Sequence, residues 1–268
     1  MIRLQEVLPI GEPNAFKLHF GRYNGQHEPL DEWARDHEKW VGWQEYRPGR
    51  DDFNRPYIFS LMNFHPEPGV WLFGGVFDVV ERLPDQYIVG LSPLGQNMIG
   101  RLKIHYPYYD RATRVRFENH YGEMQVSEIL REPYGGRSFP GFDAIDLSFN
   151  ELETLVLKNR LDWRQALISA KGVYLITDTL THKRYVGSAY GEQGIWSRWM
   201  EYAQSGHGGN AELRLIVPEA NLDYCRANFR FALLEYHLPR ALDDYIINRE
   251  NYWKSVLVTR GAFGLNRN

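Results

Sequence analysis

Short apolar runs rich in β-branched and aromatic residues recur between residues 57 and 130, and Gly, Pro, Asn and Asp separate them. Such runs are typical of strands, and the residues between them are typical of turns. Before these runs, the spacing of three tryptophans indicates a helix over residues 31–43. The sequence therefore predicts a mainly β N-terminal domain, barrel-like or a sandwich, over residues 1–147. We expect its strands at residues 57–62, 70–80, 87–91, 101–106, 113–118 and 124–130.

A capping-box pattern marks the next element, because Ser148 is followed three residues later by Glu151. The apolar residues after it are spaced as on one face of a helix, and they are Leu152, Leu155, Val156 and Leu167. We therefore expect one connector helix over residues 148–170. The boundary of the N-terminal domain is expected near residues 146–148.

From residue 171 the pattern changes to short strands that alternate with helices. Residues 173–177 and 183–189 predict a hairpin whose polar link is the turn. The later elements are expected to be a helix over 192–205 ended by the glycines of 206–209, a short helix from Asn210 to 217, a strand over 228–236, a helix over 238–257 and a tail over 261–268. The order β-β-α-α-β-α predicts a small mixed sheet with helices packed on it. The whole chain is therefore expected to be an α+β protein.

The composition indicates a globular protein with room for one large domain or two modest ones, since its 268 residues are 43% hydrophobic and 15% aromatic. One cysteine, Cys225, excludes an internal disulfide and a cysteine-based zinc site. No apolar run approaches the length of a membrane span, and the first residues lack the apolar segment of a signal peptide. We therefore expect a cytoplasmic protein without a membrane partner.

The charge is unevenly divided along the chain, although the net value is only −3. From residue 171 onward there are 12 Lys and Arg against 10 Asp and Glu, whereas the first 170 residues carry 19 against 24. Phosphate affinity comes from local clusters of Lys and Arg. A net acidic first part therefore argues against strong sequence-independent DNA binding there.

Each tyrosine of the predicted hairpin lies close to a glycine: Tyr174 follows Gly172, and Tyr185 precedes Gly187. Paired strands lie about 4.8 Å apart, so the hairpin can bring both hydroxyls into one pocket. Glycine inside a strand often marks close approach of another group, which favours this interpretation. The alternative is that both tyrosines simply pack a sheet, because tyrosine is common in strands.

Arg198 and Tyr202 are four residues apart in a predicted helix and therefore share one face. A guanidinium among apolar neighbours needs a partner or an anionic ligand, unless its stem lies along the surface and the charge reaches water. His207 lies in the glycine-rich stretch after this helix. The glycines would let backbone or phosphate come close to it, although loop histidines are usually just polar.

Glu250 falls on the apolar stripe of the last predicted helix, in register with Ile246 and Trp253. Burying an ionised carboxylate without a cation costs several kcal/mol. A divalent metal ion would compensate for this cost, and carboxylate oxygen suits Mg²⁺ or Mn²⁺. The alternative is an ion pair with Arg198 or Arg249.

These residues follow one another in the order of a known family. Gly172-Val173-Tyr174, Tyr185-Val186-Gly187, Arg198, His207, Glu250 and Asn266 together resemble the GIY-YIG nuclease superfamily, and within it the catalytic domain of phage homing endonucleases. The resemblance covers residues 171–268 and rests on six separate elements at plausible spacings. It implies phosphodiester hydrolysis that depends on one divalent ion, Mg²⁺ or Mn²⁺, in each active site.

The resemblance gives four residues direct roles. Glu250 would be the metal ligand. Tyr174 and Tyr185 would position or deprotonate the attacking water, and the choice of base between them is open. Arg198 would stabilise the charge that grows on the phosphate. The metal ion would act as a Lewis acid and stabilise the leaving oxygen.

Three further residues would support the chemistry. His207 would assist proton transfer or hold the phosphate, and Asn266 would help to order the site. Four residues after the arginine, homing enzymes have histidine, whereas this chain has Tyr202. The incision subunit of bacterial nucleotide-excision repair is similar in having tyrosine there. The change is therefore compatible with activity, and the identity of the general base stays open.

We interpret the chain as a metal-dependent DNA endonuclease, with RNA not excluded as a partner and with restriction or defence against foreign DNA as a hypothesis for its role. Cutting both strands needs two active sites or two visits, so a homodimer is a further hypothesis. Two other interpretations stay open. The chain would be a nucleic-acid-binding protein whose nuclease fold no longer cuts, or an aromatic-rich module that binds carbohydrate or protein.

A barrel-like domain in front of a nuclease would most naturally select the target. Residues 71–77 are loosely similar to part of PUA-like modules, which read modified or flipped bases through aromatic pockets. Aromatic side chains that stack on bases would have to be exposed, and the candidates are Trp33, Trp40, Trp43, Trp71, Tyr108 and Tyr109. The alternative is that these aromatics fill the core.

Overall fold

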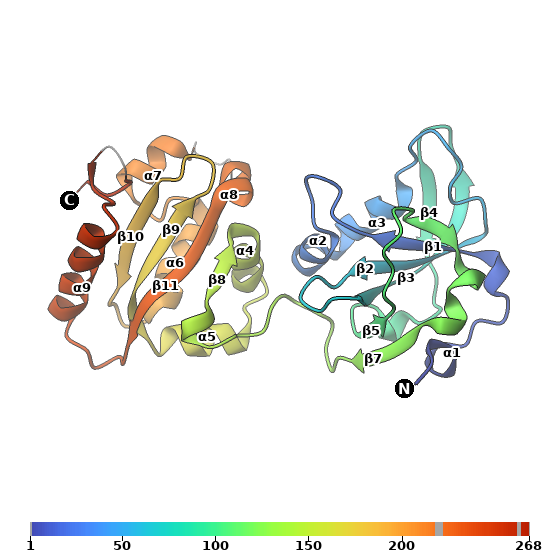
Figure 1. The fold of residues 1–268 in the computed structure, drawn as a ribbon, viewed down its shortest axis with the longest axis horizontal. Helices are drawn as coiled ribbons and strands as arrows, with labels where there is room; N and C mark the ends of the chain where they lie inside the picture. Colours follow the sequence, from blue (N-terminus) through green and yellow to red (C-terminus); the bar gives the residue numbers. More distant parts are fainter. Residues whose placement is uncertain (1, 218–221, 262–263, 268) are drawn as a thin grey trace. The chain divides into compact units, whose positions relative to one another are not determined.

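The computed structural model describes residues 2–217, 222–261 and 264–267, and its chain forms two compact units, Met1–Tyr134 and Gly135–Asn268 (Figure 1). The sequence placed the boundary later, near residues 146–148. The boundary lies earlier because the short strand β8 (Asp146–Ser148) pairs with β11 (Phe229–His237) and so belongs to the second unit. Within the described part of the chain, no helix is long and apolar enough to cross a membrane.

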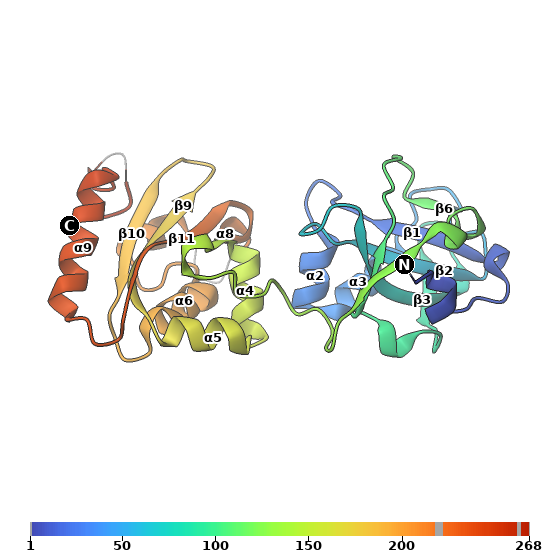
Figure 2. The same cartoon turned by 60° about the horizontal axis from the view of Figure 1, so that its bottom comes forward.

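The first unit is built on one curled sheet of seven strands in the order β6-β1-β2-β3-β5-β7, with β4 paired to β3 (Figures 1 and 2). Its strands are β1 (Phe16–Gly21), β2 (Tyr57–Asn63), β3 (Val70–Arg82), β4 (Tyr87–Leu91), β5 (Leu102–His105), β6 (Arg114–Arg116) and β7 (Gln125–Ile129). β1 and β2 are parallel, and the other pairs of neighbouring strands in the described sheet are antiparallel. The six predicted strands are confirmed, and β1 is an addition. The described strands form no β6–β7 pair, so the curl does not close into a barrel.

Both faces of this sheet are apolar and each carries a core. The inner face packs Phe20, Phe59 and Phe73 against the short helix α1 (Leu4–Val7) and the 3₁₀ turns η3 (Phe117–Asn119) and η4 (Tyr121–Glu123). The outer face packs under the helices α2 (Pro29–Arg35) and α3 (His37–Glu45), with Ile58, Met62 and Leu72 among its buried residues. Short strands that bury both faces lose the strict apolar–polar alternation of a half-exposed sheet.

The helix expected over residues 31–43 is instead two helices, α2 and α3, which meet at Asp36. The backbone of Asp36 is extended, and its side chain accepts a hydrogen bond from the Glu38 backbone N–H at 3.1 Å. This is N-cap geometry, which starts a new helix rather than continuing the old one.

Most of the aromatic side chains proposed to stack on bases belong to the core. Trp33, Trp40, Trp71 and Tyr108 are buried, so the core alternative is right for them. Trp40 fits because its indole lies against Gly74, whose carbonyl accepts a hydrogen bond from Trp40 Nε1 at 3.0 Å. Two candidates remain accessible, since Trp43 is half-buried and Tyr109 is exposed.

His19, in β1, makes the stability of the first unit depend on pH. It is buried, and its Nδ1–H donates to Gln44 Oε1 at 2.7 Å in the neutral form. Burial lowers its pKa from 6.5 to about 4, with the Arg114 charge adding to the effect. Between these two values the unfolded chain binds a proton that the folded chain does not.

We therefore predict that His19 contributes a fall of up to about 3 kcal/mol in the free energy of unfolding as pH falls from about 6.5 to 4, and no slope above that window. Glu28 in the same unit acts in the opposite direction, because burial raises its pKa from 4.5 to about 7, so the His19 contribution is read from the difference between the parent and a His19 variant. Urea unfolding followed by tryptophan fluorescence at several pH values measures the slope. As pH falls through this window, His19→Asn, whatever its absolute stability, is expected to lose less stability than the parent, by up to about 3 kcal/mol. Equal slopes in the two proteins would contradict this account.

The second unit has a four-stranded sheet in the order β10-β9-β11-β8, and neighbouring strands in it are antiparallel. The expected mixed sheet is therefore wrong. The strands besides β8 and β11 are β9 (Lys171–Asp178) and β10 (Arg184–Ala189). The helices are α4 (Phe149–Leu157), α5 (Leu161–Ile168), α6 (Gly194–Ser205), α7 (Ala211–Ile216), α8 (Asp223–Asn228) and α9 (Asp243–Val256). The chain thus adds α8 to the predicted order, and the predicted tail lies partly outside the described residues.

The single connector helix expected over residues 148–170 is also replaced by two helices. The capping box is confirmed, because Ser148 Oγ accepts from the Glu151 backbone N–H at 3.2 Å and Glu151 accepts from the Ser148 backbone N–H at 2.8 Å. The helix ends at Leu157, and Asn159 then has a left-handed φ of 47°. Both α4 and α5 pack on α6, so they are part of this unit's core.

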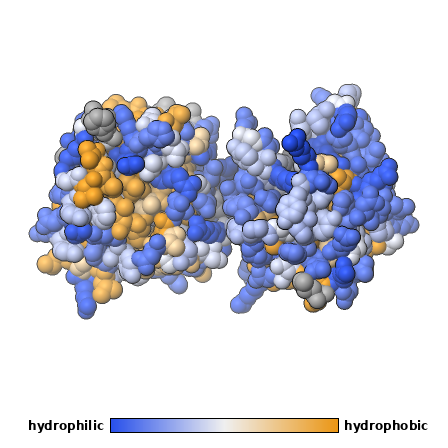
Figure 3. All heavy atoms as spheres, in the orientation of Figure 1, coloured by the Kyte–Doolittle hydropathy of each residue, from blue (hydrophilic) through white to orange (hydrophobic). Residues whose placement is uncertain are grey.

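Helices cover the two faces of this sheet unequally. One face packs against α4, α5 and α6 in the main core, and on the other face Val173 and Val186 pack against Ile246 of α9. Figure 3 shows apolar surface gathered over the face that α9 covers only in part. The α+β class is therefore confirmed, with helices on both sides of the second sheet.

Candidate active site

The two strand glycines allow the hairpin to pack tightly around Tyr174. In the β9–β10 register Tyr174 lies opposite Gly187, and a Cβ atom on Gly187 would lie 2.5 Å from the Tyr174 hydroxyl. A Cβ on Gly172 would clash with the Glu235 carbonyl on β11. The close approach predicted at both glycines is therefore confirmed.

Tyr174 meets a second buried phenol from α6. Its hydroxyl lies 3.2 Å from the Tyr202 hydroxyl, and the Tyr185 ring centroid is 6.4 Å from that of Tyr202. Burial raises the pKa of all three phenols above their usual value near 10. The neighbouring phenols add to the rise at Tyr202, and the Glu250 charge adds to the rise at Tyr185. At neutral pH all three are therefore un-ionised and can donate hydrogen bonds.

Arg198 lies one helical turn before Tyr202 and sits beside this cluster. Its guanidinium carbon is 5.6 Å from the Tyr202 ring centroid, and it forms an ion pair with Glu201 on the same helix. Burial alone would lower the pKa of Arg198, but the neighbouring phenols and Glu201 outweigh this and raise it. The side chain is 32% exposed, so a permanently charged guanidinium is partly open to solvent.

A small polar cavity of about 330 Å³ joins three of the seven predicted site residues. Tyr185, Glu250 and Asn266 line it, together with Tyr190, Asn210, Ile247, Asn251 and Lys254. The other predicted residues, Tyr174, Arg198, Tyr202 and His207, are not in its wall. Of the three phenols in the buried cluster, Tyr185 is thus the one in the cavity wall.

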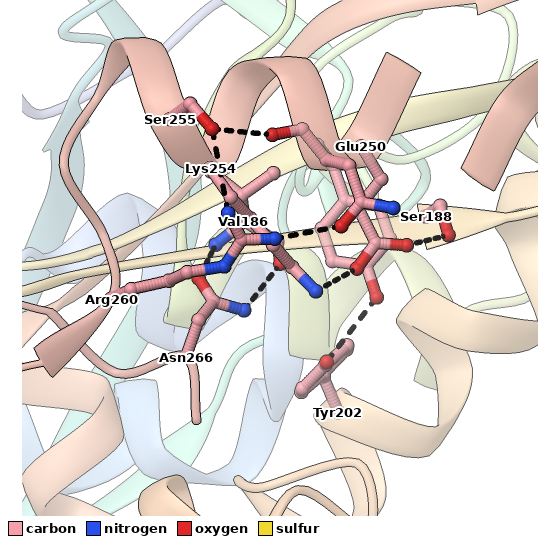
Figure 4. Close-up of polar contacts among 10 residues, drawn as sticks. Val186, Ser188, Tyr202, Glu250, Lys254, Ser255, Arg260 and Asn266 are labelled. Carbon is pink, nitrogen blue, oxygen red and sulfur yellow. Dashed lines mark hydrogen bonds and ion pairs between the residues drawn. The ribbon is translucent and has the colours of Figure 1, made fainter. Parts of the chain in front are cut away.

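Glu250 has a different partner from those expected. Its Oε1 accepts from Lys254 Nζ at 2.7 Å, and its Oε2 accepts a short hydrogen bond from the Ser188 hydroxyl (Figure 4). Arg249 pairs with Glu235, and Arg198 pairs with Glu201, so the ion pairs proposed for Glu250 with these arginines are wrong. The Glu250 carboxylate is only 16% exposed. Its compensation in this structure comes from an ammonium group one turn away on α9.

The donor set around Glu250 fits a divalent ion that is bound mainly by water and substrate. Among the described residues, no group of three or more His, Cys, Asp or Glu side chains is placed to hold a metal ion. Mg²⁺ often binds through one or two carboxylates and completes its octahedron with water and phosphate oxygens. A single largely buried carboxylate in a polar cavity matches that mode, and Lys254 would have to give up part of its contact.

Asn266 holds the strand that carries Tyr185. Its Oδ1 accepts from the Val186 backbone N–H at 3.0 Å, and its Nδ2 donates to the Val186 carbonyl at 2.9 Å (Figure 4). The Leu265 backbone N–H also donates to the Arg184 carbonyl, which brings this part of the tail along β10. The amide therefore fixes the backbone between the cavity phenol and Gly187.

We predict that Asn266→Ala lowers the free energy of unfolding by about 1–3 kcal/mol, because it leaves the buried N–H and C=O of Val186 without partners. Denaturant unfolding measures the change. Asn248→Ala, on an α9 residue outside the cavity wall, serves as the matched control and is expected to change stability much less. Equal losses in the two variants would contradict the assigned clamp.

His207 lies in the turn between α6 and α7 and outside the cavity wall. Its Nδ1 accepts from the Gly209 backbone N–H at 3.0 Å. The next residue, Gly208, has a left-handed φ of 51°, and a Cβ there would lie 2.6 Å from the Tyr202 ring. The backbone at Gly208 therefore packs directly on the buried Tyr202 ring. Asn210, and not His207, lines the cavity.

Sequence reasoning missed two residues that contact the central carboxylate, Ser188 and Lys254. The contact of Lys254 could have been predicted, because a glutamate followed by a lysine four residues later forms a favourable ion pair in a helix. Ser188 had none, since its contact with Glu250 spans 62 residues of sequence.

Comparison with known proteins adds one solved structure. No family model matches the sequence, and no curated protein matches it. The chain is similar to a structure described as the catalytic domain of the homing endonuclease I-TevI, with 30% sequence identity over 37% of this chain and 98% of that one. The TM-score is 0.28. A score this low does not establish a shared fold, so the assignment of the site rests on its own geometry.

Proposed function

We propose that residues 171–268 form a GIY-YIG-type nuclease domain that hydrolyses phosphodiester bonds of DNA with the help of Mg²⁺ or Mn²⁺. One observation carries the proposal: the largely buried Glu250 carboxylate and the Tyr185 hydroxyl line the same small polar cavity. A divalent ion can replace the Lys254 ammonium as the counter-charge of this carboxylate, and a phenol in the same cavity wall can orient water. The order of motifs along the chain supports the same assignment.

In this proposal the chain's own groups divide the work. Tyr185 orients the attacking water from the cavity wall, and Tyr174 and Tyr202 hold its ring in place from behind. Arg198 stabilises the charge on the phosphate, because its guanidinium is partly exposed and always charged. Glu250 holds the divalent ion, which would supply a Lewis acid and stabilise the leaving oxygen.

The raised pKa of Tyr185 bears on the identity of the general base. A neutral phenol cannot accept a proton from water, so Tyr185 would act as a base only where a nearby cation favours its ionised form. Without such help its role is to position the water by hydrogen bonding. The proposal therefore gives Tyr185 the contact with water and leaves His207 a supporting role in the turn behind it.

We further propose that the first unit selects the target, which would suit restriction or defence against foreign DNA. To test the nuclease assignment, the full chain is incubated with supercoiled plasmid, linear duplex and modified phage DNA, with Mg²⁺, Mn²⁺ or EDTA. Nicked or linear products that form with metal and disappear with EDTA are expected. Cleavage that persists in EDTA would overturn metal dependence.

A second candidate function rests on the Lys254–Glu250 ion pair. An ammonium group on the carboxylate is also what a nuclease fold that binds but no longer cuts would contain. DNA binding without cleavage, for every substrate and metal in the same assay, would favour that alternative over the proposed hydrolase.

A further inference from the structure

The first unit contains a cavity of about 750 Å³, larger than that of the candidate active site, and every residue in its wall belongs to this unit. Its wall comes from the end of β1 and the loop after it, from α3, from residues 46–52 and from residues 111–114. This volume is within the range of pockets that bind small molecules or single groups of a larger ligand.

The cavity concentrates positive charge on a unit that is otherwise acidic. Its basic side chains are Arg22, Lys39, Arg50, Arg111 and Arg114, and its acidic ones are Glu32 and Asp52. Residues 1–134 as a whole carry 15 Lys and Arg against 19 Asp and Glu. The net charge of the cavity wall is therefore positive although that of the unit is negative, and this favours an anionic ligand.

Two of these cations are available to a ligand. Lys39 and Arg111 are exposed, and neither side chain has a hydrogen-bonding or ion-pair partner among the described residues. Arg22, in contrast, donates to the Tyr108 carbonyl at 2.5 Å and to the Asp110 carbonyl at 2.8 Å, so it is fixed in the wall.

Arg114 is a buried cation with spare hydrogen-bonding capacity. Its side chain is 10% exposed, and burial lowers its pKa. Its Nη2 donates to the Tyr46 carbonyl at 2.8 Å, whereas its buried Nη1 makes no hydrogen bond and lies 3.7 Å from Asp52 Oδ2. A buried donor without an acceptor costs free energy that an anionic ligand would recover.

Flat aromatic surface stands beside these cations. Tyr46 is 63% exposed, and the Arg114 guanidinium carbon lies 5.6 Å from its ring centroid. Trp43 is half-buried, and its Nε1 donates to Glu32 Oε2 at 2.8 Å, which fixes the indole. Aromatic faces held next to phosphate-binding cations are the pattern that takes a stacked base.

We propose that this cavity binds one nucleotide of a DNA strand, with the base against Tyr46 and Trp43 and the phosphates on Lys39 and Arg111. A neutral sugar would leave the cations unused, and an acidic peptide would leave the aromatic faces unused. A base inside a duplex cannot enter a pocket, so the nucleotide is unpaired or extruded. The choice of DNA as the strand rests on the proposed function. In this inference the first unit recognises the DNA that the second unit cleaves.

The test measures binding of the intact full chain to a fluorescein-labelled DNA single strand of about 12 nucleotides in EDTA, by fluorescence anisotropy over a range of salt. Tyr46→Ala is expected to weaken binding at least about 5-fold, through lost stacking. Lys39→Gln with Arg111→Gln is expected to reduce the slope of log affinity against log salt by about 1.4. An excess of deoxynucleoside monophosphate is expected to displace the strand.

Two variants serve as matched controls, because Tyr57→Ala and Arg116→Gln alter an exposed tyrosine and an exposed arginine outside the cavity wall. Both are expected to bind the strand normally. Unchanged binding in both cavity variants would overturn the inference. So would competition by a polyglutamate peptide that matches or exceeds competition by the mononucleotide. Failure of the proposed nuclease is distinguishable, because it is read from cleavage in Mg²⁺ and leaves the effect of Tyr46→Ala on binding intact.

Discussion

Glu250→Gln is expected to lower the rate of DNA cleavage by about 10³-fold, because a divalent ion supplies several kcal/mol of transition-state stabilisation and the amide is a poor ligand for it. Glutamine has the same shape, so it keeps an acceptor for the Ser188 hydroxyl. Cleavage of plasmid in Mg²⁺ and Mn²⁺ measures the loss. Glu192→Gln, on an exposed residue outside the cavity wall, is expected to cut at the wild-type rate.

The substitution also removes the partner of Lys254, whose side chain is only 7% exposed. Leaving a buried ammonium uncompensated destabilises a protein by about 3–5 kcal/mol, so loss of activity alone would be ambiguous. The double variant Glu250→Gln with Lys254→Met removes both charges and is expected to recover most of the lost stability but none of the activity. Cleavage at near the wild-type rate in either variant would rule out Glu250 as the metal ligand.

Tyr185→Phe is expected to reduce cleavage by about 10²- to 10⁴-fold, the usual range for a group that handles a proton or orients the reacting water. The change removes one hydroxyl from the cavity wall and leaves the ring in place. Tyr174→Phe is expected to have a smaller effect on cleavage but a larger one on stability, because its hydroxyl is buried against that of Tyr202. Single-turnover rates and denaturant midpoints separate the two effects.

Tyr236→Phe provides the comparison, since Tyr236 is exposed on β11 and stacks on Phe142 at 4.4 Å between ring centroids, away from the cavity. It is expected to leave cleavage at the wild-type rate. If Tyr174→Phe lost more activity than Tyr185→Phe at unchanged stability, the assignment of the water-facing phenol would be reversed.

Local signals in the sequence predicted most elements of the fold, and long-range contacts decided the rest. The predicted strand over 87–91 matches β4, because its apolar run is bounded by turn residues. β1 was missed, although Phe16, Leu18 and Phe20 alternate, because it lies in a stretch dominated by Gly, Pro and Trp. The single helix expected over 31–43 is two helices because Asp36 caps the start of α3. The spacing of apolar residues alone does not reveal such a cap.

Some residues of the candidate site could be predicted from their neighbours in sequence, whereas others depend on contacts with distant residues. Tyr185 and Glu250 could be singled out because a phenol beside a strand glycine and a carboxylate on an apolar stripe are unusual locally. Asn266 looked uninformative by itself, since its meaning depends on two hydrogen bonds to Val186, 80 residues away. His207 was expected to assist the chemistry, and the structure places it in the turn between α6 and α7, outside the cavity wall.

The central claim is that the Glu250 carboxylate holds a divalent ion next to Tyr185. It is tested most directly by anomalous diffraction from crystals of the full chain soaked in Mn²⁺ with a short oligonucleotide, beside crystals of Glu250→Gln treated in the same way. The account predicts a peak about 2.0–2.6 Å from a Glu250 carboxylate oxygen in the wild type and none in the variant. A wild-type map with no peak there, and with Lys254 still bound to that carboxylate, would contradict it.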